Sequence, residues 1–298
     1  MRWKRGQQVK TRIQKTVHDA SLSGQDSMLN IPSQRIRAFR KDIFGFYARK
    51  GRDLPWRNTA DPYAILLSEI MLQQTQVDRV VAYYRRWLRK WPTIHELAEA
   101  NRADILREWL GLGYNNRAKY LHETARIISE KYKGDVLAAL DHHQGLPGIG
   151  PYTAAAVRIF SANEDAITVD TNIRRILIHR FKLGESTNDK ELWELARRCL
   201  PKGRSRDWHN ALMDYGAVFL TSRKTGIRPK TRQGKFEGSD RQVRARVLRH
   251  LLEKRQGNIK ELRALSKCGA KRLHDILGRM ESDNIIHKYH DAYRVAGQ

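Results

Sequence analysis

The sequence predicts an all-α protein, and three observations lead to this fold class. Apolar residues recur at the i, i+3, i+4 spacing of helices through most of the stretch from about 35 to 222. The sustained alternation of apolar and polar residues that indicates strands is missing there. Gly and Pro mark a sharp turn, LPGIGP at 146–151, between two helical patterns. The expected helices cover 36–50, 62–90, 102–109, 115–132, 151–162, 172–182, 188–199 and 207–220.

Changes in composition divide the chain into four parts. A basic N-terminal tail (1–34) precedes the helical domain (35–222), and a basic linker (223–239) precedes the last part (240–298). The linker, RKTGIRPKTRQGKFEGS, is rich in Gly, Pro and charge and poor in apolar residues. From 223 to 255 there are 12 Lys and Arg against three acids, so this is the most basic stretch of the chain.

The pattern of the last part predicts three helices followed by a β-hairpin. RQVRARVLRHLLEK, NIKELRALS and AKRLHDILGRM each have helical spacing, and NIIHKYHDAYRVAG alternates around His290 and Asp291. This order is typical of a winged-helix-like domain. In a DNA-binding version the third helix, 270–281, would enter a major groove. Other such domains bind protein or simply pack, so both alternatives stay open.

The charge of the chain points to a polyanionic partner. Lys and Arg number 57 against 32 Asp and Glu, which gives a net charge of +25 and a pI near 10.3. Nucleic acid is the partner that such a balance favours, with a ribosome-like or merely solubilising surface as the alternative. A hydrophobic content of 40% is enough for a core and excludes disorder as the explanation.

Cysteine content and hydropathy exclude several other classes. The two cysteines, Cys199 and Cys268, exclude a disulfide scaffold and any four-thiolate metal or iron–sulfur site. No run of about 18 apolar residues predicts a membrane span, and the basic N-terminus lacks the apolar region of a secretory signal. We therefore expect no membrane partner and a cytoplasmic, nucleoid-associated, prokaryotic and monomeric protein.

The motif LPGIGPYTAAAV (146–157) predicts a helix–hairpin–helix that grips a phosphate. Gly148 and Gly150 allow positive φ and a close approach of a nucleic-acid backbone. Pro151 suits the first turn of the following helix, whose free N–H groups form an anion site. An ordinary helix–turn–helix corner is the alternative. Thr153 is expected to contact DNA as well, and a monovalent cation at the hairpin is a further expectation.

Five motifs in order resemble the helix–hairpin–helix DNA glycosylase superfamily: LPWR (54–57), DPYAILLSEIMLQQTQV (61–77), GLGYNNRAKYLH (111–122), LPGIGPYTAAAV and VDTNIRRIL (169–177). The resemblance covers roughly 35–222 and is closest to the adenine DNA glycosylases that act on A opposite 8-oxoguanine. It implies a two-lobed helical fold and, as partner, double-stranded DNA with a mismatched or damaged pair.

Two carboxyl groups are the predicted catalytic pair. Glu69 lies among apolar residues on a predicted helix, where desolvation should raise its pKa into the range of a general acid. Asp170 follows the apolar run AITV and opens a helix, where an N-cap would hold it rigid and ionised. A surface Glu and a merely structural cap are the alternatives. The resemblance implies that Glu69 protonates a flipped base and that Asp170 stabilises the positive sugar.

The resemblance also implies roles for other residues. Asn172 would orient Asp170 or the attacking water, and Tyr152 would lie beside the sugar where strand-nicking members have a lysine, so the chain looks monofunctional. Gln74 and Thr75 resemble the plug that contacts the orphaned base, and Tyr114 the wedge beside it, with a buried core Tyr as the alternative. Arg57 resembles a contact to the flipped base, although an Arg beside a Trp is also an ordinary surface arrangement.

Three departures from the adenine branch leave the excised base open. Leu220 stands where the first of four cluster cysteines would be, so no iron–sulfur cluster is expected. The usual lesion-sensing C-terminal domain is replaced by the winged-helix-like part. Asp214 stands where adenine enzymes have a Glu that contacts the base, as in T·G and U·G mismatch glycosylases. The predicted function is release of adenine opposite 8-oxoguanine or guanine. A thymine/uracil mismatch glycosylase and a non-catalytic DNA-binding winged-helix regulator are the alternatives.

Overall fold

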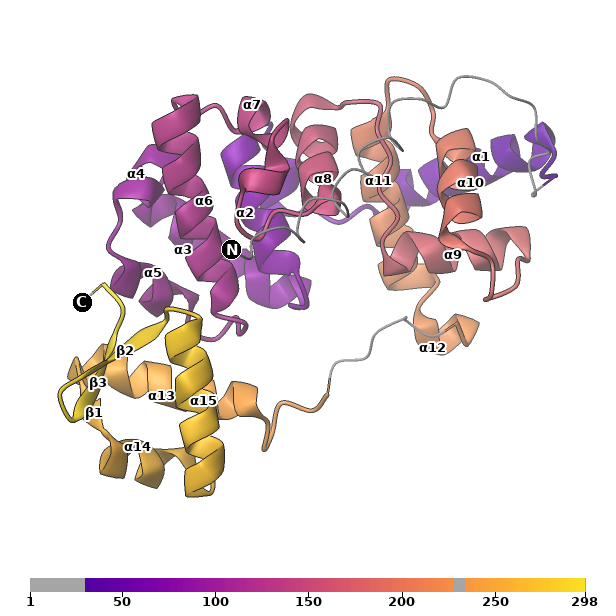
Figure 1. Cartoon of the computed structure of the whole chain (residues 1–298). Coiled ribbons are helices and arrows are strands. Elements are labelled where there is room, and N and C mark those ends of the chain that lie inside the picture. The colour runs from indigo at the N-terminus through magenta and orange to yellow at the C-terminus, as the bar shows by residue number, and fades with distance from the viewer. Residues whose placement is uncertain (1–29, 228–233, 298) are drawn as a thin grey trace, which may run out of the picture.

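The structure of the chain is a computed structural model that describes residues 30–227 and 234–297 (Figure 1). The predicted N-terminal tail lies almost wholly outside the described residues, and so does the middle of the predicted linker. Within the described ranges no helix is both long and apolar enough to cross a membrane.

The all-α prediction for the first 222 residues is confirmed, with more elements than expected. The short helices α4 and α7 were missed, and the expected helix 62–90 is two helices separated by a turn at Gln73–Gln76. The elements are α1 (Ser33–Lys50), η1 (Pro55–Arg57), α2 (Pro62–Leu72), α3 (Val77–Lys90), α4 (Ile94–Glu99), α5 (Arg102–Trp109), α6 (Asn116–Tyr132), α7 (Val136–Leu140), η2 (His143–Gly145), α8 (Pro151–Ala162), α9 (Thr171–Phe181), α10 (Asp189–Cys199), α11 (Ser205–Asp214), the π-helical turn η3 (Tyr215–Phe219) and α12 (Ser222–Thr225).

These helices form two lobes, each around its own hydrophobic core, as the resemblance implied. The first core is built from α2 to α8, with Leu66, Trp87 and Trp109 among its fully buried side chains. The second joins α1 to α9, α10 and α11, and Phe39 of α1 packs edge-on against Trp208 of α11. The second lobe therefore combines the first described helix with helices from much later in the chain (Figure 1).

Helix α2 lies at the centre of the first lobe. Asp61 caps its N-terminus by accepting hydrogen bonds from the N–H groups of Tyr63 and Ala64, and Pro62 occupies its first turn. Every residue from Tyr63 to Met71 is buried except Glu69. The helix therefore has one polar side chain that leaves the core, and its position is fixed by packing on all other sides.

The last part forms a unit of three helices and a small sheet. It contains α13 (Asp240–Lys254), β1 (Gly257–Asn258), α14 (Ile259–Ser266), α15 (Ala270–Ser282), β2 (Ile286–Tyr289) and β3 (Ala292–Val295). The strands are antiparallel in the order β1-β3-β2. The predicted helices and hairpin are present, with His290 at φ 51° in the turn. β1 was not predicted, and assignment to the winged-helix class stays a prediction.

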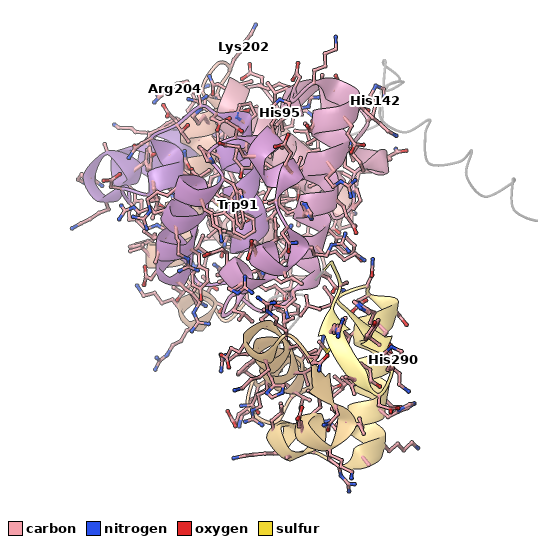
Figure 2. The ribbon with its side chains drawn as sticks, turned by 90° about the vertical axis from the view of Figure 1, so that its left-hand side faces the viewer. Trp91, His95, His142, Lys202, Arg204 and His290 are labelled. Carbon is pink, nitrogen blue, oxygen red and sulfur yellow. The ribbon has the colours of Figure 1, made fainter. Side chains whose placement is uncertain are left out.

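This C-terminal unit packs against the first lobe, as two views at right angles agree (Figures 1 and 2). The hydrophobic core of the first lobe continues into it through side chains such as Val247 and Leu277. Polar contacts add to this interface: the Lys119 ammonium donates to the Asp283 carbonyl at 2.7 Å, and the Asn101 amide donates to the Gly297 carbonyl at 3.1 Å. In Figure 2, His290 lies on the outer hairpin, at the opposite end of the molecule from Lys202 and Arg204.

One half-buried side chain, Arg117 of α6, links two loops of the first lobe. One of its nitrogens donates to the carbonyl oxygens of Ile70, Met71 and Gln73 at the C-terminal end of α2, at 2.7–3.0 Å. The other donates to the carbonyl oxygens of Leu112 and Gly113, both at 3.0 Å. Burial lowers the pKa of this guanidinium to about 10, which leaves it charged at neutral pH.

Replacing Arg117 with Ala should leave these carbonyl oxygens without protein donors. We expect the free energy of unfolding to fall by about 3 kcal/mol, because each buried polar group left unpaired costs about 1–3 kcal/mol. Urea unfolding followed by circular dichroism measures the loss. Arg126→Ala is the matched control on the same helix, since Arg126 forms an exposed ion pair with Glu130 and its loss should cost less than about 1 kcal/mol. Equal losses of unfolding free energy for the two variants would contradict this role of Arg117.

Candidate active site

A cleft of about 760 Å³ opens between the two lobes. The first lobe contributes η1, α2, α8 and the turn at Gln73–Gln76, and the second contributes α9 and the junction of α11 with η3. The residues predicted to be catalytic all line this cleft, and so does Arg57. They are Glu69, Tyr152, Asp170 and Asn172. The fold therefore brings together residues that come from three separate motifs of the sequence.

Glu69 reaches the cleft from the buried stretch of α2, with Ile65 and Ser68 of the same helix beside it. Desolvation of its carboxyl group raises its pKa to about 7, and the negative charge of Asp170 contributes in the same direction. This matches the direction expected from the apolar sequence around it. A carboxyl group with a pKa raised toward neutrality can hold a proton at neutral pH and donate it, which is what a general acid requires.

Asp170 caps α9 as predicted. Its Oδ1 accepts a hydrogen bond from the Ile173 N–H at 2.7 Å, and its Oδ2 accepts one from the Asn172 amide at 3.1 Å. Burial outweighs these hydrogen bonds and raises the pKa of Asp170 above its usual value. Glu69 has only burial and the charge of Asp170 acting on its pKa. Of the two groups, Asp170 is therefore the better suited to be the carboxylate, because its oxygens already accept two hydrogen bonds.

Sequence reasoning missed Arg175, which fixes Asn172 from behind. Its Nη2 donates to Asn172 Oδ1 at 2.6 Å and to the Gly216 carbonyl at 3.1 Å, and its Nε donates to the Leu220 carbonyl at 2.6 Å. The amide of Asn172 is thus oriented with its NH₂ group toward Asp170. A charged residue three positions after Asn172, on the apolar side of TNIRRIL, was the signal available in the sequence.

Tyr152 stands at the mouth of the cleft, on the first turn of α8, with 36% of its surface exposed. Burial of its hydroxyl end raises its pKa, and the charges of Glu69 and Asp170 add to this effect. The phenol is therefore neutral at physiological pH. It can contact a ligand by stacking or hydrogen bonding, and it offers no amine for Schiff-base chemistry.

Arg57 and Asp214 form a buried ion pair beside the cleft. Both terminal nitrogens of Arg57 donate to the Asp214 carboxylate at 2.8 Å, and Arg52 holds the same carboxylate through its Nε at 2.6 Å and its N–H at 2.8 Å. These donors lower the pKa of Asp214 in spite of its burial. Asp214 has no exposed surface and does not line the cleft, unlike the direct base contact that we expected. Arg57 does line it, and its buried Nε has no hydrogen-bond partner within the described residues.

The predicted hairpin is present, with two differences. Gly148 has φ +75°, whereas Gly150 has φ −92° and is not in the left-handed region, because it caps the extended start of α8. Pro151 is at the first position of α8 as predicted, and no side chain caps the free N–H groups there. Thr153 is buried, so its side chain does not reach the surface. The Thr124 hydroxyl donates to the Pro147 carbonyl at 2.9 Å and anchors the hairpin to α6.

The turn after α2 separates the cleft from a second cavity. Gln73, Thr75 and Gln76 line both, while Gln74 and Tyr114 line only the second, which measures about 1260 Å³. Gln74 (φ 55°) and Tyr114 (φ 49°) adopt left-handed backbone conformations at exposed loop tips. Tyr114 is 36% exposed and is therefore no ordinary core tyrosine.

The residues present do not fit a four-cysteine cluster. Cys199 is buried in α10, Cys268 lies in the C-terminal unit, and the sequence contains no other cysteine. Leu220, at the place of the first cluster cysteine, is buried in the second core. Across 30–227 and 234–297, no group of three or more His, Cys, Asp or Glu is placed to hold a metal ion. The cation expected at the hairpin stays a prediction.

Comparison with known proteins agrees with this fold. Residues 67–202 match the family model described as HhH-GPD superfamily base excision DNA repair protein. The chain is 36% identical over 202 residues to the adenine DNA glycosylase of Rattus norvegicus, covering 63% of this chain and 39% of that protein. It is 36% identical over 231 residues to the adenine DNA glycosylase of Mycobacterium tuberculosis, covering 70% and 76%. A solved thermostable thymine-DNA glycosylase superposes with a TM-score of 0.59 and 32% identity, covering 64% and 90%.

The chain therefore belongs to the HhH-GPD superfamily of base excision DNA repair proteins. It spans about two fifths of the length of the rat relative. Proteins that act on different bases are among its relatives, since one is named for adenine and another for thymine.

The two hairpin glycines should differ in their tolerance of a side chain. A Cβ at Gly148 would lie 2.9 Å from Tyr120 Cβ in a left-handed conformation, so Gly148→Ala should cost about 1–3 kcal/mol of stability. Gly150→Ala should leave the Tm unchanged, because a Cβ there meets no atom within 4 Å. Differential scanning calorimetry of both variants measures the difference, and a Gly150→Ala variant that is the less stable of the two would refute this account.

Proposed function

We propose that the chain is a monofunctional DNA glycosylase that hydrolyses the N-glycosidic bond of a flipped adenine and leaves an abasic site. The observation that carries the proposal is the carboxyl pair of Glu69 and Asp170 in one cleft, with two hydrogen-bond donors fixed on Asp170 and a raised pKa at Glu69. Glycoside cleavage uses such a pair, one group as acid and the other as stabiliser. The adenine DNA glycosylases among the relatives favour adenine as the base.

In the proposed reaction Glu69 donates its proton to a ring nitrogen of the base. The bond between that base and C1′ then breaks with its electron pair going to the base, and positive charge develops on the sugar. Asp170, held by Ile173 and Asn172, lies ready to stabilise this charge without reorganising. Water adds to C1′ and gives up a proton to the carboxylate pair, which returns the site to its starting state.

Other lining residues fit the same reaction. The unpaired Nε of Arg57 is a donor for the flipped base, and the Asp214 pair holds that guanidinium in place. Tyr152 lies where it can contact the sugar. Within the described part of the chain no lysine lines the cleft, which supports hydrolysis without strand cleavage.

The remaining predicted contacts concern the duplex. The free N–H groups at the start of α8 would bind a phosphate, and the positive φ of Gly148 brings the backbone close to the strand. Gln74 and Thr75 would fill the space left by the flipped base, with Tyr114 beside the base that loses its partner. The high net charge would make this binding strongly dependent on salt.

Thymine or uracil opposite guanine is the second candidate substrate. Two observations favour it: Asp214 replaces the Glu of adenine enzymes, and the similar thymine-DNA glycosylase is covered over 90% of its length. A non-catalytic DNA-binding regulator would need neither the desolvated carboxyl pair nor the cleft around it. We also propose that the chain works without an iron–sulfur cluster, because it has only two cysteines.

A panel of duplexes tests the substrate. We expect the purified chain to release adenine from A·8-oxoG and A·G duplexes and to act at least 10-fold more slowly on T·G and U·G. Strand breaks at the released position should appear only after alkali, since the product is an abasic site. Gel electrophoresis with and without alkali measures both results. Faster release of thymine or uracil would replace adenine with the second candidate.

The pH dependence tests Glu69. Because its pKa is raised to about 7, the acid form is present below that pH and is lost above it. We expect kcat/KM to fall about tenfold per pH unit above pH 7. Glu69→Gln should release no measurable base at any pH and should bind the duplex within threefold of the wild type. Glu130→Gln, an exposed change on α6, is the control. A rate that stays constant from pH 7 to 9 would remove Glu69 from this role.

A further inference from the structure

The second cavity lies between the first lobe and the C-terminal unit. Gln74, Tyr114 and the hairpin residue Gly148 line it from the first lobe, and Phe236 and Arg241 line it from the other side. The turn at Gln73–Gln76 is the wall between this cavity and the catalytic cleft. The two cavities therefore lie on opposite sides of one short segment of chain.

Arg241 is the side chain that the C-terminal unit brings to Tyr114. Its Nη1 donates to the Tyr114 hydroxyl at 3.2 Å, and its Nη2 donates to the carbonyl oxygen of Gly234 at 2.6 Å. The guanidinium lies 5.4 Å from the centre of the Tyr114 ring and 5.9 Å from that of Phe236, which is half-exposed. A planar cation between two aromatic rings at the edge of a cavity is suited to contact a base.

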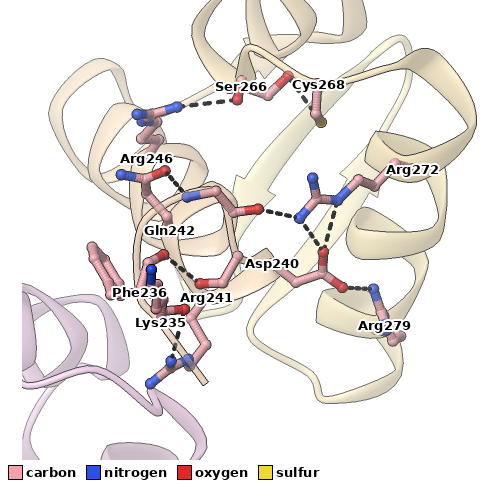
Figure 3. Close-up of polar contacts among 12 residues, drawn as sticks. Lys235, Phe236, Asp240, Arg241, Gln242, Arg246, Ser266, Cys268, Arg272 and Arg279 are labelled. Carbon is pink, nitrogen blue, oxygen red and sulfur yellow. Dashed lines mark hydrogen bonds and ion pairs between the residues drawn. The ribbon is translucent and has the colours of Figure 1, made fainter. Parts of the chain in front are cut away.

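The neighbouring residue Asp240 fixes this end of α13. Its carboxylate accepts hydrogen bonds from Arg272 at 2.9 Å and from Arg279 at 2.5 Å, both on α15. Arg272 also donates to the Gly238 carbonyl at 2.7 Å. Figure 3 shows the two arginines converging on Asp240, while Phe236 and Arg241 lie on the side nearest the ribbon of the first lobe. The two α15 arginines thus form their contacts within the C-terminal unit, whereas Arg241 points toward the first lobe and contacts Tyr114.

The cavity is also positively charged. Arg79, Arg244 and Arg249 line it in addition to Arg241, against the acids Asp78 and Asp283. Asp283 is already paired with Arg244 at 2.6 Å. The surplus of cations suits a segment of DNA strand, with phosphates at the rim and a base toward the aromatic side chains.

We propose that this cavity binds the base opposite the excised one, and that Arg241 selects a guanine-class base by donating to its O6 atom. The inference rests on the proposed function. Adenine opposite 8-oxoguanine or guanine, and thymine or uracil opposite guanine, all leave a guanine-class base behind. Its O6 carbonyl is the acceptor that an arginine recognises, and adenine has an amino donor at that place. The C-terminal unit thereby supplies partner-base recognition.

The test measures binding, so that it does not depend on catalysis. Duplexes carry a tetrahydrofuran abasic analogue opposite guanine or opposite 2-aminopurine, which lacks O6. We expect the wild-type chain to bind the guanine duplex about 10-fold more tightly by fluorescence anisotropy. Arg241→Met keeps the length of the side chain and removes its donors, and should bind both duplexes equally. Lys254→Met, at the exposed far end of α13, loses the same charge and should keep the preference.

Each outcome bears on the proposal. A wild-type chain that binds the two duplexes equally, or an Arg241→Met variant that keeps the 10-fold preference, overturns it. The comparison of duplexes on the wild-type chain stands even when the variant is poorly folded. A preference that depends on Arg241 in a chain that releases no base supports the binding site and refutes the proposed glycosylase. Base release without a preference for the partner base supports the proposed glycosylase and refutes the role of Arg241.

Discussion

The desolvation of two carboxyl groups in one cleft is the constraint on which the site depends. Neither lobe alone contains both groups. Glu69 comes from the buried helix α2 of the first lobe, and Asp170 is the N-cap of α9 in the second. Burial raises both pKa values, and the charge of Asp170 raises that of Glu69 further. The hydrogen bonds from Ile173 and Asn172 act in the opposite direction on Asp170 and make the two groups unequal. An acid and a carboxylate at neutral pH follow from this asymmetry rather than from the residue types alone.

Three arginine side chains hold the residues around the cleft and its neighbouring loops in position. Arg175 orients Asn172, Arg57 is held by Asp214, and Arg117 joins the turn after α2 to the loop that presents Tyr114. Each places a planar group with several donors against carbonyl or carboxylate oxygens, which fixes orientation as well as position. Part of the high positive charge of this chain is therefore structural, and only the rest is available to a polyanion.

Local patterns predicted the parts of the fold that depend on local interactions. Helical spacing located the long helices, the Asp170 cap was read correctly, and the hairpin of the C-terminal unit followed from its alternation. The short helices α4 and α7 were missed because five or six residues give too little periodicity to detect. Gly150 lacks the positive φ that the motif allows, because it caps the extended start of α8. Asp214 pairs with Arg57, 157 residues away, and no sequence pattern indicates this contact. The partners of Arg117 lie up to 47 residues away, and no sequence pattern indicates them.

The composition of the second lobe has a consequence for how the chain reaches its native state. Helix α1 packs against α9, α10 and α11, and these helices are synthesised only after the whole first lobe. Until then its apolar face, with Phe39 and Ile43, has no permanent partner, and closing so long a loop is slow. The first lobe can assemble from a continuous segment. The cleft forms only after α9, α10 and α11 have packed against α1. A nascent chain that ends before α11 therefore lacks the cleft.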